Sequence, residues 1–465
     1  MNDHIICFWK RKQFSFFLPT GKKKANLLIR NFILLTLTLI MILTSDTYSF
    51  ASEKGIIQAL IDEAKPGEEI TIQAGIYEEV ISITKPIKIN GEGVMLINTS
   101  DDIAIHIKSD HVSLSGLTVV QLTSHPESPA ILIEGNDNHL SQLTINSLGT
   151  SIQLFSANRN LLEHLHIERQ NPINFGEANM GSRQGNGFDL FASHENVLKN
   201  NTMINLLDGV YIESSRGNII ENNHAIRSRY GYHLMFAEDI LLNNNSASLN
   251  ITGAMIMGSS RVTISNNHFT KQSYHVHSQG LLLYDVHDSV VRGNDFSENL
   301  IGLYIERSSK NDVHENKIFA NFVGIQLKRV GTHKISHNDF FTNVIQARVT
   351  DSEGNHVAEN YWDTHTGLDF TGDGKSELTF QADPIFLGLV ERKPPYQLLA
   401  QSPGLLFVQL LFEMNEEAIL KDISPLMEPF SQQITSNKTS TLYDVFLYLS
   451  LMVLSIIIIR GGIRK

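Results

Sequence analysis

The sequence predicts an all-β fold, a right-handed parallel β-helix (solenoid) in which each coil takes about 22 residues. The clearest observation is a set of asparagines spaced 22 residues apart, with one interval of 27: Asn201, Asn223, Asn245, Asn267, Asn294, Asn316, Asn338 and Asn360. A short fixed period is typical of solenoids, in which each unit buries its apolar face against its neighbours. Identical amides stacked about 4.8 Å apart can form a hydrogen-bonded ladder, so we interpret these asparagines as structural.

Two further positions of the repeat are apolar in every coil and are expected to point into the core. The first lies three residues before each reference position and holds Leu114, Leu140, Leu162, Leu198, Ile220, Leu242, Ile264, Val291, Val313, Ile335 and Val357. The second lies two residues after it and holds Val119, Ile145, Ile167, Met203, Ala225, Ala247, Phe269, Phe296, Ile318, Phe340 and Trp362.

A third element of each coil is a short alternating segment that follows a glycine, as at 209–213, 231–235 and 253–257. Alternation with period two predicts a strand whose successive side chains point to opposite faces. The glycine is expected at a bend before the strand. Each coil therefore contains short parallel strands separated by polar corners.

The N-terminal region predicts export from the cytoplasm. Residues 1–51 read as a signal peptide, with basic residues, an apolar run at 32–43 and small residues before a cleavage point after Ala51. An uncleaved membrane anchor is the alternative. Residues 52–95 are expected to form an N-terminal cap and first coil, with a helix at 53–64 over the open end of the core, and residues 96–362 form the β-helix. Cys7 is the only cysteine, so the mature chain has no disulfide or thiolate site.

The C-terminal region predicts attachment to a membrane. After a loop at 363–395, residues 396–430 are expected to form a helical segment that docks on a membrane partner or caps the core. A linker at 431–441 leads to an apolar transmembrane helix at 442–459 and a basic tail at 460–465, which is expected in the cytoplasm. The β-helix would then lie on the extracytoplasmic side of the cell membrane.

Composition and motifs exclude several function classes. The net charge of −12 makes nucleic acid an unlikely partner. The sequence has no nucleotide-binding glycine loop, nucleophile elbow or zinc-binding helix motif.

One pair of strands carries side chains suited to a soft metal ion. His233 and Met235 are expected to point outward beside Met255 and Met257 of the next coil. An insertion at 271–279 carries His275 and His277 and could fold over them. Thioether and imidazole ligands suit Cu(I), so these six residues are our predicted metal site. The alternatives are a hydrophobic contact surface for a partner protein, since methionine packs adaptably, or a chance grouping.

Other candidate ligands have simpler explanations. Asp369 and Asp373 lie in an oxygen-rich segment with part of the spacing of a calcium loop, but Asx turns at Gly372 and Gly374 account for it equally well. Further histidines are expected to be solvated corner residues: His111, His139, His194, His333 and His356.

Several of these segments together resemble the NosD family of nitrous oxide reductase maturation proteins. They are Gly-Tyr-His-Leu-Met-Phe at 231–236, Gly-Ala-Met-Ile-Met at 253–257, Asn-Tyr-Trp-Asp at 360–363, Gly-Asp-Gly at 372–374 and Ser-Pro-Gly-Leu-Leu-Phe at 402–407. The resemblance implies a periplasmic copper-binding β-helix, an accessory protein and not an enzyme, that helps to assemble the copper–sulfur centre of nitrous oxide reductase. It also implies as partners an ABC transporter permease with its ATPase, and a lipoprotein copper chaperone that supplies Cu(I). The predicted C-terminal anchor departs from the soluble form of that family.

A carbohydrate-active enzyme, such as a lyase, hydrolase or epimerase, is the alternative function, because the same fold supports both. Such an enzyme needs carboxylates and cationic side chains at adjacent outward positions. Asp189, Glu213, Arg227 and Arg229 are the candidates.

Overall fold

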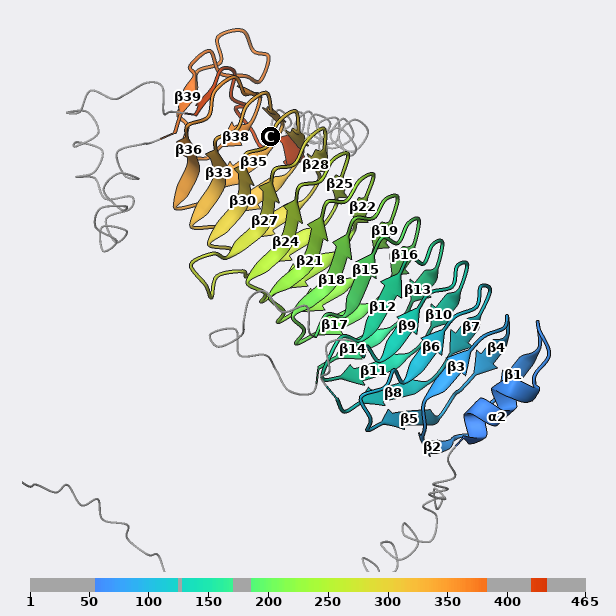
Figure 1. The fold of residues 1–465 in the computed structure, drawn as a ribbon. Helices are drawn as coiled ribbons and strands as arrows, with labels where there is room; N and C mark the ends of the chain where they lie inside the picture. Colours follow the sequence, from blue (N-terminus) through green and yellow to red (C-terminus); the bar gives the residue numbers. More distant parts are fainter. Residues whose placement is uncertain (1–54, 124–127, 170–184, 383–419, 433–465) are drawn as a thin grey trace, which may run out of the picture. The chain divides into compact units, whose positions relative to one another are not determined.

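The computed structural model describes residues 55–123, 128–169, 185–382 and 420–432, and its strands form a parallel β-solenoid of the right-handed type (Figure 1). Each coil contributes one strand to each of three parallel sheets. The first sheet runs through 13 strands from β1 (Glu69–Thr71) to β37 (His356–Ala358), and the second through 13 strands from β2 (Gly75–Glu78) to β38 (Tyr361–Trp362). The predicted all-β class and 22-residue coil are confirmed.

The third sheet has 12 strands, and its strands β21 and β24 carry His233, Met235, Met255 and Met257 of the predicted metal site. Its strands are β3 (Ile81–Ile83), β6 (Ile105–Ile107), β9 (Ile131–Ile133), β12 (Ile152–Phe155), β15 (Phe188–Phe191), β18 (Asp208–Glu213), β21 (Tyr230–Met235), β24 (Thr252–Met257), β27 (Gln279–Tyr284), β30 (Ile301–Glu306), β33 (Val323–Lys328) and β36 (Ile345–Thr350). The strands are six residues long from β18 onward, which widens this face.

Both predicted apolar columns are confirmed as part of one buried core. Leu140 pairs in register with Leu114 and Leu162, and the same register continues to Val357. Of the eleven aliphatic residues in the first column, ten are fully buried and Val357 is 6% exposed. The second column ends in a stack in which Trp362 lies between Phe340 and Phe380, with centroid distances of 4.1 and 4.2 Å.

The asparagine column is a continuous buried hydrogen-bonded ladder. The backbone N–H of Asn223 donates to the side-chain oxygen of Asn245 at 2.9 Å, and the same bond recurs from each asparagine to the next. The side-chain amide of Asn223 also donates to the Leu198 carbonyl at 2.8 Å. The residue before it, Asn222, has a φ of 57°, a left-handed conformation that asparagine tolerates and that turns the chain between two sheets.

A buried carboxylate ends this ladder. Each asparagine donates toward the C-terminal end, so the last one needs an acceptor that no further coil supplies. Asp422, in β40 (Lys421–Asp422), accepts from the Asn360 backbone N–H at 3.0 Å and side-chain amide at 2.9 Å, and from the Trp362 indole at 3.0 Å. The short stretch at 420–432 thus completes the last coil.

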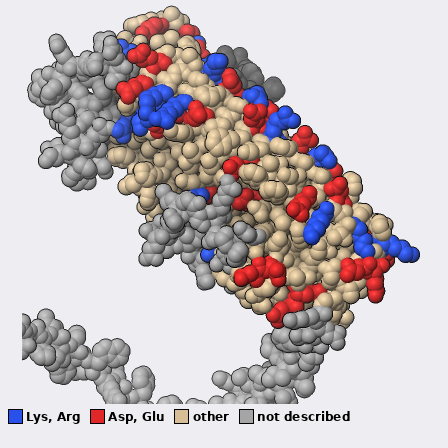
Figure 2. Space-filling view, in the orientation of Figure 1, with Lys and Arg blue, Asp and Glu red and all other residues tan. Residues whose placement is uncertain are grey.

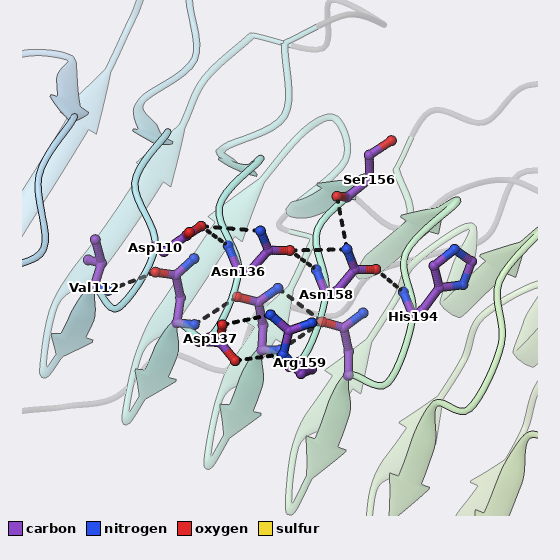
Figure 3. A network of polar contacts seen from close by, with 11 residues as sticks. Asp110, Val112, Asn136, Asp137, Ser156, Asn158, Arg159 and His194 are labelled. Carbon is purple, nitrogen blue, oxygen red and sulfur yellow. Dashed lines mark hydrogen bonds and ion pairs between the residues drawn. The ribbon is translucent and has the colours of Figure 1, made fainter.

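Other polar columns were not predicted. One holds Asn250, Gln272, Asn299, Asn321 and Asn343, each five residues after the main column, and it carries the same backbone-to-side-chain bonds. Another lies in earlier coils, where the backbone N–H of Asn158 donates to Asn136 and that of His194 donates to Asn158, both at 2.9 Å (Figure 3). Several corners of the coil are therefore sealed by side-chain amides.

The glycines of the third sheet do not serve the predicted bend. Gly231 and Gly253 lie within β21 and β24, and neither has a positive φ. A Cβ atom on Gly231 would lie 2.5 Å from the carbonyl oxygen of Gly253 in the next coil. Glycine is required here because the coils approach each other too closely for a side chain.

A short helix covers the N-terminal end of the core. Helix α2 (Ile56–Glu63) buries Ile57 and Ile61, and Figure 1 shows it beside β1 and β3. The Glu79 carboxylate accepts from the backbone N–H groups of Ile57 and Gln58 at 2.9 and 3.1 Å, which satisfies donors at the start of the helix.

Several predictions lie outside the described residues. These are the signal peptide at 1–51, the docking segment up to 419, the linker from 433, the transmembrane helix at 442–459 and the tail at 460–465. Within the described ranges, no helix is long and apolar enough to cross a membrane.

His333 is not the solvated corner residue that the sequence suggested. It is 1% exposed and occupies a ladder position, where its Nδ1 accepts from the Asn311 backbone N–H at 3.1 Å. Its own N–H donates to the Asn355 side chain at 3.1 Å, so it replaces an asparagine between two others. Burial lowers the pKa of His333 below its ordinary value.

We predict that Asp422→Ala destabilises the C-terminal coils by about 3 kcal/mol or more, because three buried donors lose their acceptor. Asp422→Asn should cost less, since an amide oxygen still accepts as it does along the ladder. Native-state hydrogen exchange of the last coils measures both. Equal protection in the alanine variant and the wild type would show that the cap is dispensable.

We predict that His333→Asn reduces the acid sensitivity of the fold. The folded-state pKa of His333 lies below its ordinary value of 6.5, so the unfolded chain binds the proton more readily. The stability that neutral His333 supports is present above that pH and is lost as the pH falls through the lower folded-state pKa. Urea unfolding at about pH 7.5 and about pH 5.5 measures this against the exposed control His356→Asn. An unchanged pH dependence in His333→Asn would contradict the prediction.

Candidate functional site

The structure brings four of the six predicted metal-site residues together on the third sheet. In the register of β21 and β24, His233 lies beside Met255 and Met235 lies beside Met257. Neighbouring strands place the Cβ atoms of such pairs about 5 Å apart. We call these four residues the His/Met cluster.

The cluster is not as solvent-exposed as the sequence suggested. The three methionines are half-buried, but His233 is only 6% exposed. The rings of Tyr211 and Tyr230 both lie edge-on to the imidazole, each at a centroid distance of 4.9 Å. His233 thus points away from the core and is nevertheless enclosed by side chains of the same sheet.

A buried ion pair lies behind His233. The Asp208 carboxylate has no exposed surface and accepts from the imidazole Nδ1 of His233 at 2.8 Å. Arg229 donates to the same carboxylate with Nε at 2.9 Å and Nη2 at 2.8 Å. The guanidinium also lies over the Tyr230 ring, 4.5 Å from its centroid. Two side chains, those of Arg229 and His233, therefore donate to the carboxylate of the preceding coil.

Both charges of this pair are maintained despite burial. Burial alone would raise the pKa of Asp208, but the hydrogen bonds from His233 and Arg229 outweigh it and lower the pKa. Burial opposes the charge of Arg229, and its bonds to Asp208 reverse that effect and raise its pKa. Burial also raises the pKa of the neighbouring Tyr230. The site therefore holds a carboxylate, a guanidinium and a neutral phenol.

The other imidazole nitrogen of His233 is the feature that suggests a ligand. A carboxylate can only accept a hydrogen bond, so Nδ1 carries a hydrogen, and in the neutral imidazole Nε2 then has a lone pair. Within the described part of the chain, this Nε2 is buried and has no hydrogen-bond partner. A buried acceptor without a partner costs free energy, and a metal ion could satisfy it.

Met235 already has one polar contact. The Tyr211 hydroxyl lies 2.7 Å from the Glu213 carboxylate and 3.4 Å from the Met235 sulfur. Tyr211 is paired in register with His233, and Glu213 with Met235. The residues that adjoin the cluster on its N-terminal side are therefore polar.

His275 and His277 lie apart from the four cluster residues, on the loop between β26 (His268–Thr270) and β27. Both are exposed, their rings are 5.3 Å apart, and the His277 backbone N–H donates to Nδ1 of His275 at 3.2 Å. The Thr252 hydroxyl, at the start of β24, donates to the His277 carbonyl at 3.4 Å. The loop is thereby fixed near the strand that carries Met255.

The chemistry of the donors favours a soft ion. No group of three or more His, Cys, Asp or Glu side chains in the described ranges is arranged to hold a metal. A site for a hard or borderline cation is therefore not evident there. One imidazole with neighbouring thioethers remains, and this donor set suits Cu(I).

The predicted enzyme candidates partly converge on the same place. Asp189 pairs in register with Tyr211, and Glu213 and Arg229 lie in the contacts described above. Arg227 lies elsewhere, since its Nε donates to the Asn205 side chain at 2.9 Å. Sequence reasoning missed Asp208. The available signal was spacing, because Arg229 follows Asp208 by 21 residues, one short of a full coil.

The oxygen-rich segment beyond the β-helix has its carboxylates engaged by backbone groups. Asp369 accepts from the N–H groups of Gly372 at 2.6 Å and Gly374 at 2.9 Å, which lowers its pKa. Asp373 accepts from the Lys375 N–H at 3.0 Å. The Asp373 contact is that of an Asx turn, whereas Asp369 binds backbone groups three and five residues further along the loop.

The visible surface carries both kinds of charge, with one compact group of basic side chains over β33 and β36 (Figure 1 and Figure 2). In Figure 2, acidic and basic side chains lie interspersed on the face seen in Figure 1. Nothing on this face resembles the continuous basic surface that nucleic acid requires.

Comparison with known proteins supports the copper interpretation. Residues 170–374 match the model of the NosD family, described as periplasmic copper-binding protein. The resemblance to NosD is confirmed. The matched stretch includes all six predicted metal-site residues as well as Asp208 and Arg229. No curated protein matches the chain.

Solved structures with the same fold come from proteins of several kinds. The A-module of mannuronan C-5 epimerase AlgE6 from Azotobacter vinelandii matches with a TM-score of 0.52 and 14% identity, over 66% of this chain and 95% of that one. The periplasmic alginate epimerase AlgG matches with a TM-score of 0.45 and 12% identity, over 67% and 80%. The Streptococcus pneumoniae surface protein and adhesin PfbA matches with a TM-score of 0.43 and 14% identity, over 65% and 91%. At 14% identity, the similarity to the AlgE6 module indicates the fold alone.

Proposed function

We propose that this protein binds Cu(I) at the His/Met cluster and delivers it for assembly of the copper–sulfur centre of nitrous oxide reductase. The observation that carries the proposal is the unpartnered, buried Nε2 of His233 beside Met255. The NosD match over the same residues, with its description as a periplasmic copper-binding family, supports it. Copper is here the cargo of the protein.

The cluster suits transient binding. His233 provides one fixed ligand, and the half-buried methionines provide flexible thioethers that can adjust around an incoming ion. Because these sulfurs are partly open to solvent, a donor or acceptor protein can reach the ion without local unfolding. His275 and His277, exposed on their loop, would be the first ligands that an ion meets.

The proposed cellular setting follows from the family and from the sequence. We place the β-helix on the extracytoplasmic side of the membrane, with an ABC transporter permease and its ATPase, a copper chaperone lipoprotein and nitrous oxide reductase as partners. The periplasmic description of the NosD family supports this location. The apolar segment at 442–459 would anchor the chain there.

A carbohydrate-active enzyme is the second candidate, because Tyr211, Glu213 and His233 lie in adjacent contacts on one sheet face. Such groups can act as acid and base. Against this function, Arg229 is already bound to Asp208 and is not placed to neutralise a substrate carboxylate.

We predict that Met255→Leu combined with Met257→Leu abolishes tight Cu(I) binding while preserving the fold. The substitution keeps the apolar volume nearly constant and should cost less than about 1.5 kcal/mol. It removes two soft donors, so the affinity should fall by more than the roughly 10- to 100-fold that loss of an outer-shell partner causes. Anaerobic competition with a Cu(I) chelator measures the affinity, and nitrous oxide reductase from the variant strain should lack its copper–sulfur centre.

Two control variants accompany this experiment. Met203→Leu changes a methionine of the buried core, and His356→Asn changes an exposed histidine outside the cluster. Both should bind copper as the wild type does. Retained copper binding in the double leucine variant would place the site elsewhere and leave the cluster as a protein contact surface.

We predict no activity on uronate polymers. Incubation with such polymers, followed by measurement of unsaturated ends, reducing ends and the ratio of epimers, tests the second candidate. Turnover that disappears in Tyr211→Phe would favour the enzyme over the copper carrier.

A further inference from the structure

Both carboxylate oxygens of Asp208 accept hydrogen bonds, and these bonds fix the orientation of the side chain. One of its oxygens accepts from Nε of Arg229, and the other accepts from Nη2 of Arg229 and Nδ1 of His233. The Asp208 backbone N–H also donates to the Asn186 side chain at 3.3 Å. The carboxylate therefore cannot turn without breaking bonds to a buried cation.

This arrangement also fixes the imidazole. The ring of His233 is held at Nδ1 by Asp208 and on its sides by Tyr211 and Tyr230. A flip of the ring would put a carbon against the carboxylate and leave Asp208 with one hydrogen bond fewer. The ring orientation and the position of its hydrogen are therefore set by Asp208 and Tyr211 of the preceding coil and by Tyr230 of the same strand.

We infer that Asp208 and Arg229 are positioning residues, which hold His233 in the tautomer with hydrogen on Nδ1 and aim its Nε2 lone pair at the cargo ion. Histidines that bind metals commonly donate their second nitrogen to a carboxylate, which fixes the tautomer and makes the ligand a better donor. Arg229 neutralises Asp208, so the protein avoids an uncompensated buried charge. The role toward copper rests on the proposed function, whereas the tautomer is a property of the metal-free protein.

A second ion pair in the same chain provides a control that distinguishes positioning of His233 from stabilisation of the fold. Arg159 donates to Asp137 with Nε at 2.9 Å and Nη2 at 2.8 Å, across two coils in the same way, as Figure 3 shows. That pair is more exposed than Asp208–Arg229, and neither of its hydrogen bonds involves a histidine ring nitrogen. It therefore serves as a matched control with the same chemistry.

The test is nitrogen NMR of the full-length, metal-free protein labelled with ¹⁵N-histidine, in which the His233 signals are assigned by their loss in His233→Gln. The wild type should show hydrogen on Nδ1 and an unprotonated Nε2. The double variant Asp208→Asn, Arg229→Gln, which removes both charges together, should show a mixture of the two tautomers. Its Cu(I) affinity should fall about tenfold or more. Asp137→Asn with Arg159→Gln should change neither quantity.

The outcomes separate this inference from the proposed function. Hydrogen on Nε2 in the wild type overturns the inference, and this result does not depend on whether the double variant folds. Full copper affinity in a folded double variant that has lost the tautomer also overturns it. A wild type with the expected tautomer and no Cu(I) affinity would overturn the proposed function and leave the positioning of His233 intact.

Discussion

The exact stacking of one coil on the next is the constraint on which the rest of this structure depends. Parallel strands bond only to the coil before and the coil after, so a slip at any corner would displace every later side chain. The buried ladder from Asn201 to Asn360 prevents such a slip, because each amide bonds to the next coil at a buried position. Asp422 then satisfies the donors that the ladder leaves at its end.

Because the coils are in register, residues about 22 positions apart become neighbours on the surface. On the third sheet, this spacing places six side chains in two rows. Tyr211, His233 and Met255 form one row, and Glu213, Met235 and Met257 form the next. The core beneath these rows is apolar and includes the buried ring of Tyr232, so the face can vary without disturbing the fold. The Asp208–Arg229 pair departs from this division, since it places two charges in a buried position behind His233.

The buried Asp208–Arg229 pair is not explained by a gain in stability, and it therefore points to another role. A buried ion pair often contributes nothing net to stability, because removing two charges from water offsets their attraction. Here the carboxylate has a third donor in His233, and the imidazole keeps an unpartnered nitrogen on its far side. A buried polar group without a partner departs from the pattern of an otherwise regular repeat. Such departures are most common at functional sites.

The sequence by itself determined the repeat, both apolar columns, the main ladder and the pairing of His233 with Met255, because each follows from a period that is visible along the chain. Only the tertiary structure decided which outward residues are buried and which polar groups meet. Asp208 reaches His233 across 25 residues, three more than one coil, and His333 proved to be buried in a column of amides where a histidine was expected to face solvent. The reason is physical: periodicity fixes where the backbone places each Cβ atom, whereas burial and hydrogen bonding depend on how neighbouring side chains fill the space between them.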